Sequence, residues 1–365
     1  LNFTFSPGNG RGVSSTYPFI SPVLYSSFGD LLVYDLNGAI SQCQDLDTAN
    51  TEYKLGANIV NNSIAGGACF NITAQNITFS GAGYSIESNQ NVSGVFSNEL
   101  NITVRDSNIS MGIGTNGRGI YIGGDADNST LINNTLGNQF YGIAVASDYN
   151  HLENNIANVN CANCIGIIIL NSVYNNITSN NASSIFDKAF YIDRLRHSTV
   201  VLNRGVSNTS KGINFHRSLN NTVTSNVGMS NNSNGILLTT SHNNTLTLNI
   251  GSSDVGGSGI TLATNSTNNI LTLNTGSANS SAGITLTQES DNSTLTLNTA
   301  ISNYTYGISI DHVSNVYLTS NNATSGVAAP DSNPAIEIYT SSNISLTNTY
   351  AVAYSSGSSA IRLRN

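Results

Sequence analysis

The sequence predicts an all-β fold, a single-stranded right-handed parallel β-helix with 23–24 residues in each coil. The first observation is a repeat, because a Gly or Ala followed by an apolar residue returns every 23 or 24 residues over most of the chain, as in a solenoid. The second is the alternation of apolar and polar residues after each start, which is typical of a strand with one buried face. The third is an asparagine that closes each repeat.

Each repeat starts on a small residue, and two apolar residues follow at alternate positions. Gly235 precedes Ile236 and Leu238, and the pattern continues to Ile361 and Leu363. We expect the start residue at a tight corner, where a positive φ or a close approach of two backbone segments excludes a larger side chain. The start residues are Gly119, Gly142, Gly166, Ala189, Gly212, Gly235, Gly259, Gly283, Gly307, Ala335 and Ala360.

A second alternating run in each repeat, such as Leu246 and Leu248 or Leu271 and Leu273, ends on an asparagine. In stacked coils each of these side-chain amides can donate to one neighbour and accept from the other. The expected column is Asn134, Asn155, Asn180, Asn203, Asn226, Asn249, Asn274, Asn298, Asn322 and Asn348. The leucine-rich repeat shares the fragment L-x-L-x-x-N, but the remainder of each repeat here is rich in Ser, Gly and Asn and has no helical face.

The repeat divides the chain into two parts. Residues 1–45 lie outside the repeat and are rich in aromatic residues, so we expect an extended segment that caps the solenoid or is donated as a strand to a neighbour. Residues 46–365 are assigned to the β-helix. The step of 28 residues from Gly307 to Ala335 predicts an inserted loop around residues 327–334.

The composition limits which partners and which cellular location we expect for this protein. Only 9% of the residues are charged and the net charge is −8, so neither a nucleic acid nor an anionic membrane is expected as a partner. No apolar run is long enough to span a membrane. The chain opens at Leu1, and we interpret it as a secreted protein whose signal peptide has been removed. No cofactor or metal is expected, since His151, His242 and His312 do not share a column.

Four cysteines form an even set, which fits an oxidising compartment. Cys43 and Cys69 flank the entry to the solenoid, and a bond between them would stabilise the fold by roughly 3 kcal/mol in the chain-entropy model. Cys161 and Cys164 form a CxxC in a turn without the helix that a redox motif requires. A local disulfide is expected there, and a bond between chains is the alternative.

Asn-Xaa-Ser/Thr sequences are frequent, and many fall in expected turns, where an attached glycan can point outward. The alternative is that turns favour asparagine for its backbone conformation. The candidates for N-glycosylation are Asn128, Asn176, Asn208, Asn220, Asn231, Asn243, Asn265, Asn279, Asn292, Asn303 and Asn343.

One segment departs from the low charge of the chain, because six of the twelve basic residues lie within residues 188–217. Stacking by one repeat places Asp193 below His216 and turns Tyr191 and Asn214 outward. The candidate contact cluster for a saccharide or a neighbouring subunit is Tyr191, Asp193, Arg194, Arg196, His197, His216 and Arg217. A polysaccharide lyase needs a base, cations against the uronate carboxylate and usually calcium-binding acids, and only one carboxylate here faces outward. No catalytic residue is therefore assigned.

The chain resembles secreted right-handed β-helix proteins of the NosD and carbohydrate-binding or sugar-hydrolase type, which occur on archaeal, especially methanogen, cell surfaces. The resemblance covers about residues 50–365. Its motifs are Tyr53-Lys54-Leu55, Cys69, Ile72, the run Asn76-Ile77-Thr78-Phe79 with Gly81 and Gly83, and the following Gly-Ile coils. It implies the fold, but the family includes lyases, copper-site maturation proteins and surface-layer components, so it does not fix an activity.

Regular coils without long loops favour an extracellular structural protein, with no catalytic activity, that self-assembles into a sheath, surface layer or filament. The expected partner is a second copy bound head to tail, because the end of a solenoid exposes unpaired backbone groups. Cell-surface glycans are a further expected partner. The alternative function is a polysaccharide-active enzyme, lyase or hydrolase, or a secreted carbohydrate-binding module.

Overall fold

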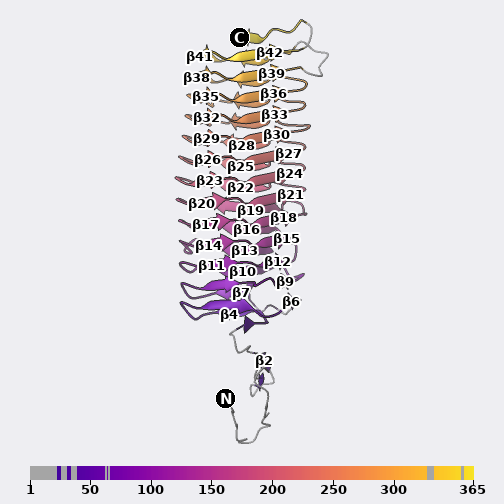
Figure 1. The fold of residues 1–365 in the computed structure, drawn as a ribbon, viewed down its shortest axis with the longest axis vertical. Coiled ribbons are helices and arrows are strands. Elements are labelled where there is room, and N and C mark those ends of the chain that lie inside the picture. Colours follow the sequence, from indigo (N-terminus) through magenta and orange to yellow (C-terminus); the bar gives the residue numbers. More distant parts are fainter. Residues whose placement is uncertain are drawn as a thin grey trace, which may run out of the picture.

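The computed structural model describes residues 39–61, 64, 66–326, 333–354 and 357–365, and the backbone of β1 (Val23–Tyr25) and β2 (Leu31–Val33). β1 and β2 pair antiparallel with each other. The rest of the described chain is a straight stack of coils (Figure 1). Most of residues 1–45 and most of the expected inserted loop lie outside the described residues, so the cap or donated strand stays a prediction.

Three parallel sheets run the length of the stack, and each regular coil contributes one strand to each of them. The right-handed parallel β-helix expected from the sequence is confirmed, and the described residues contain no helix. We name the sheets in the order in which a coil visits them. Successive strands of one sheet pair in register, so that each residue lies ~4.8 Å above its equivalent in the preceding coil.

Sheet 1 consists of β4 (Gln44–Leu46), β7 (Ala68–Ile72), β10 (Ser93–Ser97), β13 (Arg118–Ile122), β16 (Tyr141–Val145), β19 (Ile165–Leu170), β22 (Phe190–Asp193), β25 (Ile213–His216), β28 (Ile236–Thr239), β31 (Ile260–Ala263), β34 (Ile284–Thr287), β37 (Ile308–Asp311), β40 (Ile336–Tyr339) and β43 (Ile361–Arg364).

Sheet 2 consists of β3 (Ala39–Ile40), β5 (Glu52–Leu55), β8 (Thr78–Ser80), β11 (Thr103–Arg105), β14 (Thr130–Ile132), β17 (His151–Glu153), β20 (Asn176–Thr178), β23 (Thr199–Val201), β26 (Thr222–Thr224), β29 (Thr245–Thr247), β32 (Ile270–Thr272), β35 (Thr294–Thr296), β38 (Ser314–Thr319) and β41 (Ser342–Thr347).

Sheet 3 consists of β6 (Ile59–Val60), β9 (Ser85–Glu87), β12 (Asn108–Ser110), β15 (Thr135–Gly137), β18 (Ile156–Val159), β21 (Asn181–Ser184), β24 (Arg204–Ser207), β27 (Val227–Ser230), β30 (Ile250–Ser253), β33 (Thr275–Ala278), β36 (Thr299–Ser302), β39 (Asn322–Ser325) and β42 (Tyr350–Ala353).

The core is filled by the apolar pairs that follow each start residue. Ile236 and Leu238 are buried, as are the equivalent pairs from Ile120 to Ile338. The last pair differs, since Ile361 is 42% exposed and Leu363 is 73% exposed in β43. The second run was predicted less well, because Leu248 and its equivalents Leu273 and Leu297 lie half exposed in a turn.

The start residue is small because two backbone segments meet there. The described start glycines do not have a positive φ, so that part of the expectation is wrong. A Cβ on Gly235 would lie 2.6 Å from the carbonyl oxygen of Gly228 in β27 and 2.8 Å from that of Gly259 in the next coil. Since the obstacles are backbone atoms that cannot rotate away, close approach is the reason for the small residue.

The asparagine column exists and is buried. The backbone N–H and the side-chain Nδ2 of Asn226 both donate to Oδ1 of Asn249 (2.9 and 3.0 Å), and Nδ2 also donates to the carbonyl oxygen of Val200 (2.7 Å). The same bonds run from Asn134 to Asn321. The column ends on Asn321 rather than on the predicted Asn322, which opens β39, and Asn348 is exposed.

A second buried column, which the sequence reasoning missed, lies at the other end of the sheet 2 strands. In this column the backbone N–H of each member but the last donates to the side-chain oxygen of the equivalent residue in the next coil. The members are Ser129, Asn150, Asn175, Ser198, Asn221, Asn244 and Asn269. Each regular strand of sheet 2 from β17 to β32 therefore stands between two hydrogen-bonded columns. They satisfy polar turns that would otherwise be buried without partners.

Candidate functional site

The predicted contact cluster lies on the outer face of sheet 1, where β22 and β25 run side by side. Register pairs Tyr191 with Asn214 and Asp193 with His216. The strands alternate, so that Phe190 and Ile192 fill the core while Tyr191 faces away from it. The structure therefore brings together Tyr191, Asp193 and His216 as the sequence predicted.

A hydrogen-bonded chain joins these three side chains. His216 Nδ1 lies 2.8 Å from Asp193 Oδ1 and 3.2 Å from the Tyr191 hydroxyl oxygen. A carboxylate only accepts, so Asp193 selects the tautomer in which Nδ1 carries the proton and Nε2 carries the lone pair. Burial raises the pKa of the Tyr191 hydroxyl, and the Asp193 charge adds to this effect. The phenol thus stays protonated beside the imidazole at neutral pH.

Two guanidinium groups border this chain at the end of the strands. Arg194 Nη1 lies 3.8 Å from Asp193 Oδ2 and donates to Asn171 Oδ1 at 2.8 Å. Arg217 follows His216 at the equivalent turn position, and both arginines have a positive φ. Arg217 is exposed and forms no ion pair with the described residues. Its charge is free to meet an anion from solution.

The remaining two predicted residues lie elsewhere. Arg196 and His197 are exposed on the next turn, between sheets 1 and 2. His197 stacks on Tyr174 with ring centroids 5.5 Å apart, and Tyr174 stacks on Tyr149 at 5.1 Å. His197 therefore belongs to an aromatic stack on this turn rather than to the cluster, and Arg196 precedes it on the same turn.

Sequence reasoning missed the apolar surroundings of Tyr191. Ile165 and Ile168 of β19 are 5% and 4% exposed although they lie on the outer face, because Tyr121, Tyr141, Leu170 and Tyr191 pack against them. Burial raises the pKa of Tyr141 as well. The signal was the loss of alternation in Ile165-Gly-Ile-Ile-Ile-Leu170, since an apolar residue at an outward position needs a cover.

Two lysines and one amide complete the outer face. Lys188 and Lys211 lie on neighbouring coils just before β22 and β25, and Lys188 Nζ pairs with Asp187 at 2.9 Å and lies 5.0 Å from the centre of the Tyr191 ring. Burial lowers the pKa of Lys211, and the Lys188 charge adds to this. The amide oxygen of Asn214 is buried without a hydrogen-bond partner.

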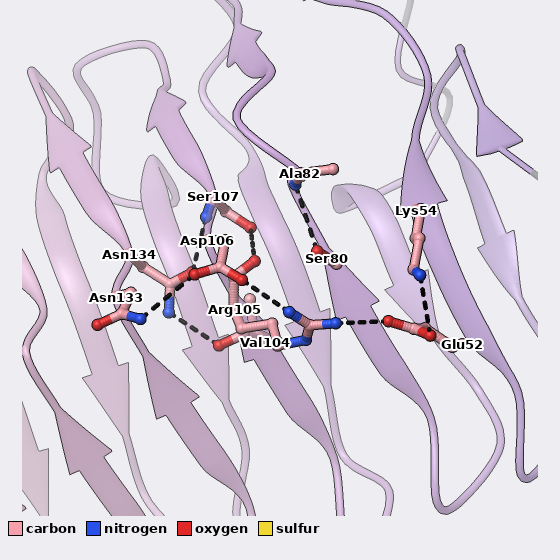
Figure 2. Close-up of polar contacts among 10 residues, drawn as sticks. All are labelled: Glu52, Lys54, Ser80, Ala82, Val104, Arg105, Asp106, Ser107, Asn133 and Asn134. Carbon is pink, nitrogen blue, oxygen red and sulfur yellow. Dashed lines mark hydrogen bonds and ion pairs between the residues drawn. The ribbon is translucent and has the colours of Figure 1, made fainter.

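A second charged cluster, at the N-terminal end of sheet 2, has no such open groups. Figure 2 shows Arg105 of β11 reaching past β8 to Glu52 of β5. Arg105 donates to Glu52 (2.6 Å) and to Asp106 (2.8 Å), and Lys54 lies 3.3 Å from Glu52. The Arg105 hydrogen bond is the largest cause that lowers the pKa of Glu52. These charges neutralise one another, so this cluster is structural.

A shallow groove of about 580 Å³ crosses the outer face of sheet 3 at β21, β24, β27 and β30. Six of its twelve lining residues are serines, and the hydroxyls of five of these are bonded, as when Ser207 Oγ donates to the Asp187 carbonyl oxygen and accepts from the Ser210 N–H. The groove therefore offers little unsatisfied chemistry for a ligand.

The remaining predicted sites are the disulfides and the candidates for N-glycosylation. Cys43 and Cys69 form a disulfide, with Cα atoms 4.5 Å apart, and Cys161 and Cys164 form another within the same chain. Of the glycosylation candidates, Asn279 is half-buried and the others are exposed. Modification at these positions stays a prediction. The described residues hold no group of three or more His, Cys, Asp or Glu that could bind a metal ion, and no helix suited to cross a membrane.

A family model described as periplasmic copper-binding protein (NosD) matches residues 197–358, which is less than half of the chain. No curated protein matches. The two disulfides fit the oxidising compartment that the sequence predicts.

Several solved structures are similar. The Dettilon tailspike protein (gp208) has a TM-score of 0.46 and 12% identity over 89% of this chain, which spans 60% of that protein. A mutant of the periplasmic alginate epimerase AlgG has a TM-score of 0.45 and 15% identity, covering 84% of this chain and 78% of that one. The A-module of the Azotobacter vinelandii mannuronan C-5 epimerase AlgE6 has a TM-score of 0.42 and 16% identity, covering 84% and 83%. At these identities the likeness shows the fold alone.

One expectation requires correction. The sequence analysis predicted a protein without catalytic activity because its coils are nearly uniform. The similar structures include an alginate epimerase, a mannuronan C-5 epimerase and a DFA-IIIase from Arthrobacter chlorophenolicus A6, which are enzymes, so the inference from uniform coils is wrong. The inference from uniform coils fails because the flat outer face of a sheet can carry reactive side chains without long loops. The chain is thus a parallel β-helix of which residues 197–358 match the NosD family model.

Proposed function

We propose that the chain acts on an acidic polysaccharide bound across the outer face of sheet 1, by proton transfer at Tyr191, Asp193 and His216. The observation that carries this proposal is the contact of His216 Nδ1 with Asp193 Oδ1 at 2.8 Å beside the Tyr191 hydroxyl. An imidazole held in one tautomer by a carboxylate presents Nε2 as a general base. The Tyr191 phenol is the proton donor in this proposal, because it lies beside the imidazole and its raised pKa keeps it protonated at neutral pH.

The number of carboxylates favours one reaction class. Glycoside hydrolysis commonly uses two carboxyl groups on either side of the scissile bond. Here Asp193 is bonded to His216, and Asp187 is paired with Lys188. Removal of a proton from the carbon next to a sugar carboxylate instead needs one base, one acid and cations against the carboxylate. His216, Tyr191, Arg194 and Arg217 supply these groups.

His216 Nε2 takes the proton of the carbon next to the sugar carboxylate, and the C–H electron pair moves into that carboxylate, whose charge the guanidinium groups of Arg194 and Arg217 oppose. The electron pair then either returns to the carbon, which takes a proton from Tyr191, or expels the neighbouring glycosidic oxygen, which takes that proton. The first outcome is epimerisation and the second is cleavage to an unsaturated sugar.

The test is incubation of the purified chain with a panel of uronate polymers in D₂O. We expect deuterium at the carbon next to the carboxylate, detected by NMR, or an unsaturated product detected by ultraviolet absorbance. His216→Gln should lower the rate about 10²-fold or more, because general base catalysis contributes this much. The matched control is His242→Gln, since His242 lies on another turn and contacts Thr267.

Each outcome bears on the proposal. Binding of a polymer without exchange or cleavage would favour the carbohydrate-binding module over the enzyme. Equal rates for the parent chain and His216→Gln would remove the assigned base. Head-to-tail self-association is not needed by this proposal and stays a prediction, to be checked by electron microscopy of the purified chain.

A further inference from the structure

We infer that Lys188, Lys211 and Asn214 form a second sugar subsite next to the acid–base cluster, which binds an anionic group and a hydroxyl of the neighbouring sugar unit. This inference rests on the proposed function for the position of the polymer. It assigns a binding role to three residues that the proton-transfer step does not use.

The central observation concerns Asn214, which is 7% exposed and whose Oδ1 has no hydrogen-bond partner. A buried amide oxygen without a donor destabilises a fold, so its presence calls for a reason. The same column holds Ile168 two coils earlier and Leu237 in the next coil. An apolar residue therefore fits this position, and structure alone does not require the amide.

The second observation is a pair of lysines, which precede Tyr191 and Asn214 on the two neighbouring coils. Lys188 is bonded to Asp187, whereas Lys211 is half-buried and forms no ion pair with the described residues. The outer face here carries four basic residues, the two lysines with Arg194 and Arg217, and two carboxylates, Asp187 and Asp193. It therefore has an excess of positive charge, although the whole chain has a net charge of −8. An anionic ligand would relieve the repulsion between the two lysines.

The register places the subsite within one sugar unit of the base. Lys211, Asn214 and His216 follow one another along one coil, and Lys188, Tyr191 and Asp193 form the parallel row one coil below. Two residues of a strand span about 6.7 Å, so Asn214 lies about one sugar ring from His216. A polymer that runs along the strands can place one unit at His216 and the next over Asn214 and the two lysines.

The test combines stability with binding in the full chain. We expect Asn214→Leu to raise the urea midpoint of unfolding, since it removes the unpaired amide, and to weaken binding of an oligogalacturonate about tenfold in calorimetry. Lys211→Met should weaken the same binding about tenfold and lessen its dependence on salt. Lys54→Met is the matched control, because Lys54 lies on sheet 2 and should leave the binding unchanged.

The probes distinguish the sources of the anion. A carboxyl-reduced oligosaccharide should bind at least tenfold more weakly than the oligogalacturonate, and a sulfated oligosaccharide that binds more tightly would identify sulfate as the preferred anion. A lowered urea midpoint for Asn214→Leu, equal binding of the neutral probe, or no binding of any probe would overturn the subsite. Binding with these variant effects but without proton exchange would overturn only the proposed chemistry, and exchange that Lys211→Met and Asn214→Leu leave unchanged would overturn only the subsite.

Discussion

At the scale of the residue, the hydrogen bonds of the buried asparagine column do not allow aspartate, the residue most similar in shape, to replace asparagine. Asn249 both donates to Asn274 and accepts from Asn226, whereas a carboxylate at this position could only accept. We expect Asn249→Asp to lower the free energy of unfolding by about 3 kcal/mol at neutral pH, the cost of a buried charge without a partner.

This loss should depend on pH in a defined direction. Burial raises the pKa of the introduced Asp above its unfolded value, so the folded state binds more protons than the unfolded state between the two values, and stability falls as pH rises. Urea unfolding at neutral and acidic pH should therefore show partial recovery in acid. Asn243→Asp, at an exposed position, is the control and should change little. An equal loss at both pH values would show that the charge is not the cause.

The ion pair of Glu52 predicts the opposite dependence on pH. Its pKa is lowered, mainly by the hydrogen bond from Arg105, so its contribution is present above the unfolded pKa and is lost as pH falls through the folded pKa. Glu52 is 39% exposed, and exposed pairs contribute about 0–1 kcal/mol. We expect Glu52→Gln to be slightly less stable than the parent at neutral pH, and the two midpoints in urea to converge in acid. A difference that grows in acid would contradict this assignment.

Residues also mark the limit of what the sequence could predict. Placing Asp193 below His216 required only the repeat length, because parallel stacking in register fixes the column. The orphan amide of Asn214 could not be predicted, since it depends on which side chains cover it. The end of the buried column on Asn321 was missed because Asn321 and Asn322 are adjacent, and the pattern alone does not say which one turns inward.

At the scale of the element, the turn from sheet 2 to sheet 3 contains an unexpected strain. Leu248, Leu273 and Leu297 adopt φ values of 57–58°, a conformation that disfavours residues with a branched side chain and suits asparagine. The side chain of Leu273 is 46% exposed, so little burial would be lost on replacement.

Leu273→Asn should therefore keep or raise the free energy of unfolding, by up to about 1 kcal/mol, in urea denaturation followed by circular dichroism. Leu271→Asn is the comparison, since Leu271 is fully buried in β32 and its replacement should be strongly destabilising. A clear destabilisation by Leu273→Asn would mean that these leucines contact more than solvent. The sequence predicted the strand but not this turn, because L-x-L reads as alternation whether or not the second leucine leaves the strand.

At the scale of the whole molecule, the period and the alternation were sufficient to predict a parallel β-helix and its columns of core residues, whereas the number of sheets, three, comes from the structure. The function could not be inferred in the same way. Uniform coils describe the backbone, whereas the candidate site differs from its neighbours only in side chains on one outer face, such as Lys211 where the next coil has Asn234. This is why regularity of the coils was a poor argument against catalysis.

The pairing of each coil with the next also affects how readily a repeat can be gained or lost in the sequence. In the three coils that start at Gly235, Gly259 and Gly283 the upper surface of one coil nearly repeats that of the coil below, with the same small start residue, apolar pair and buried asparagine. Loss or duplication of one 24-residue unit in this region would recreate an existing contact between coils rather than demand a new one. Length in this part of the molecule is therefore open to variation by unequal recombination, while the candidate site at β22 and β25 stays intact.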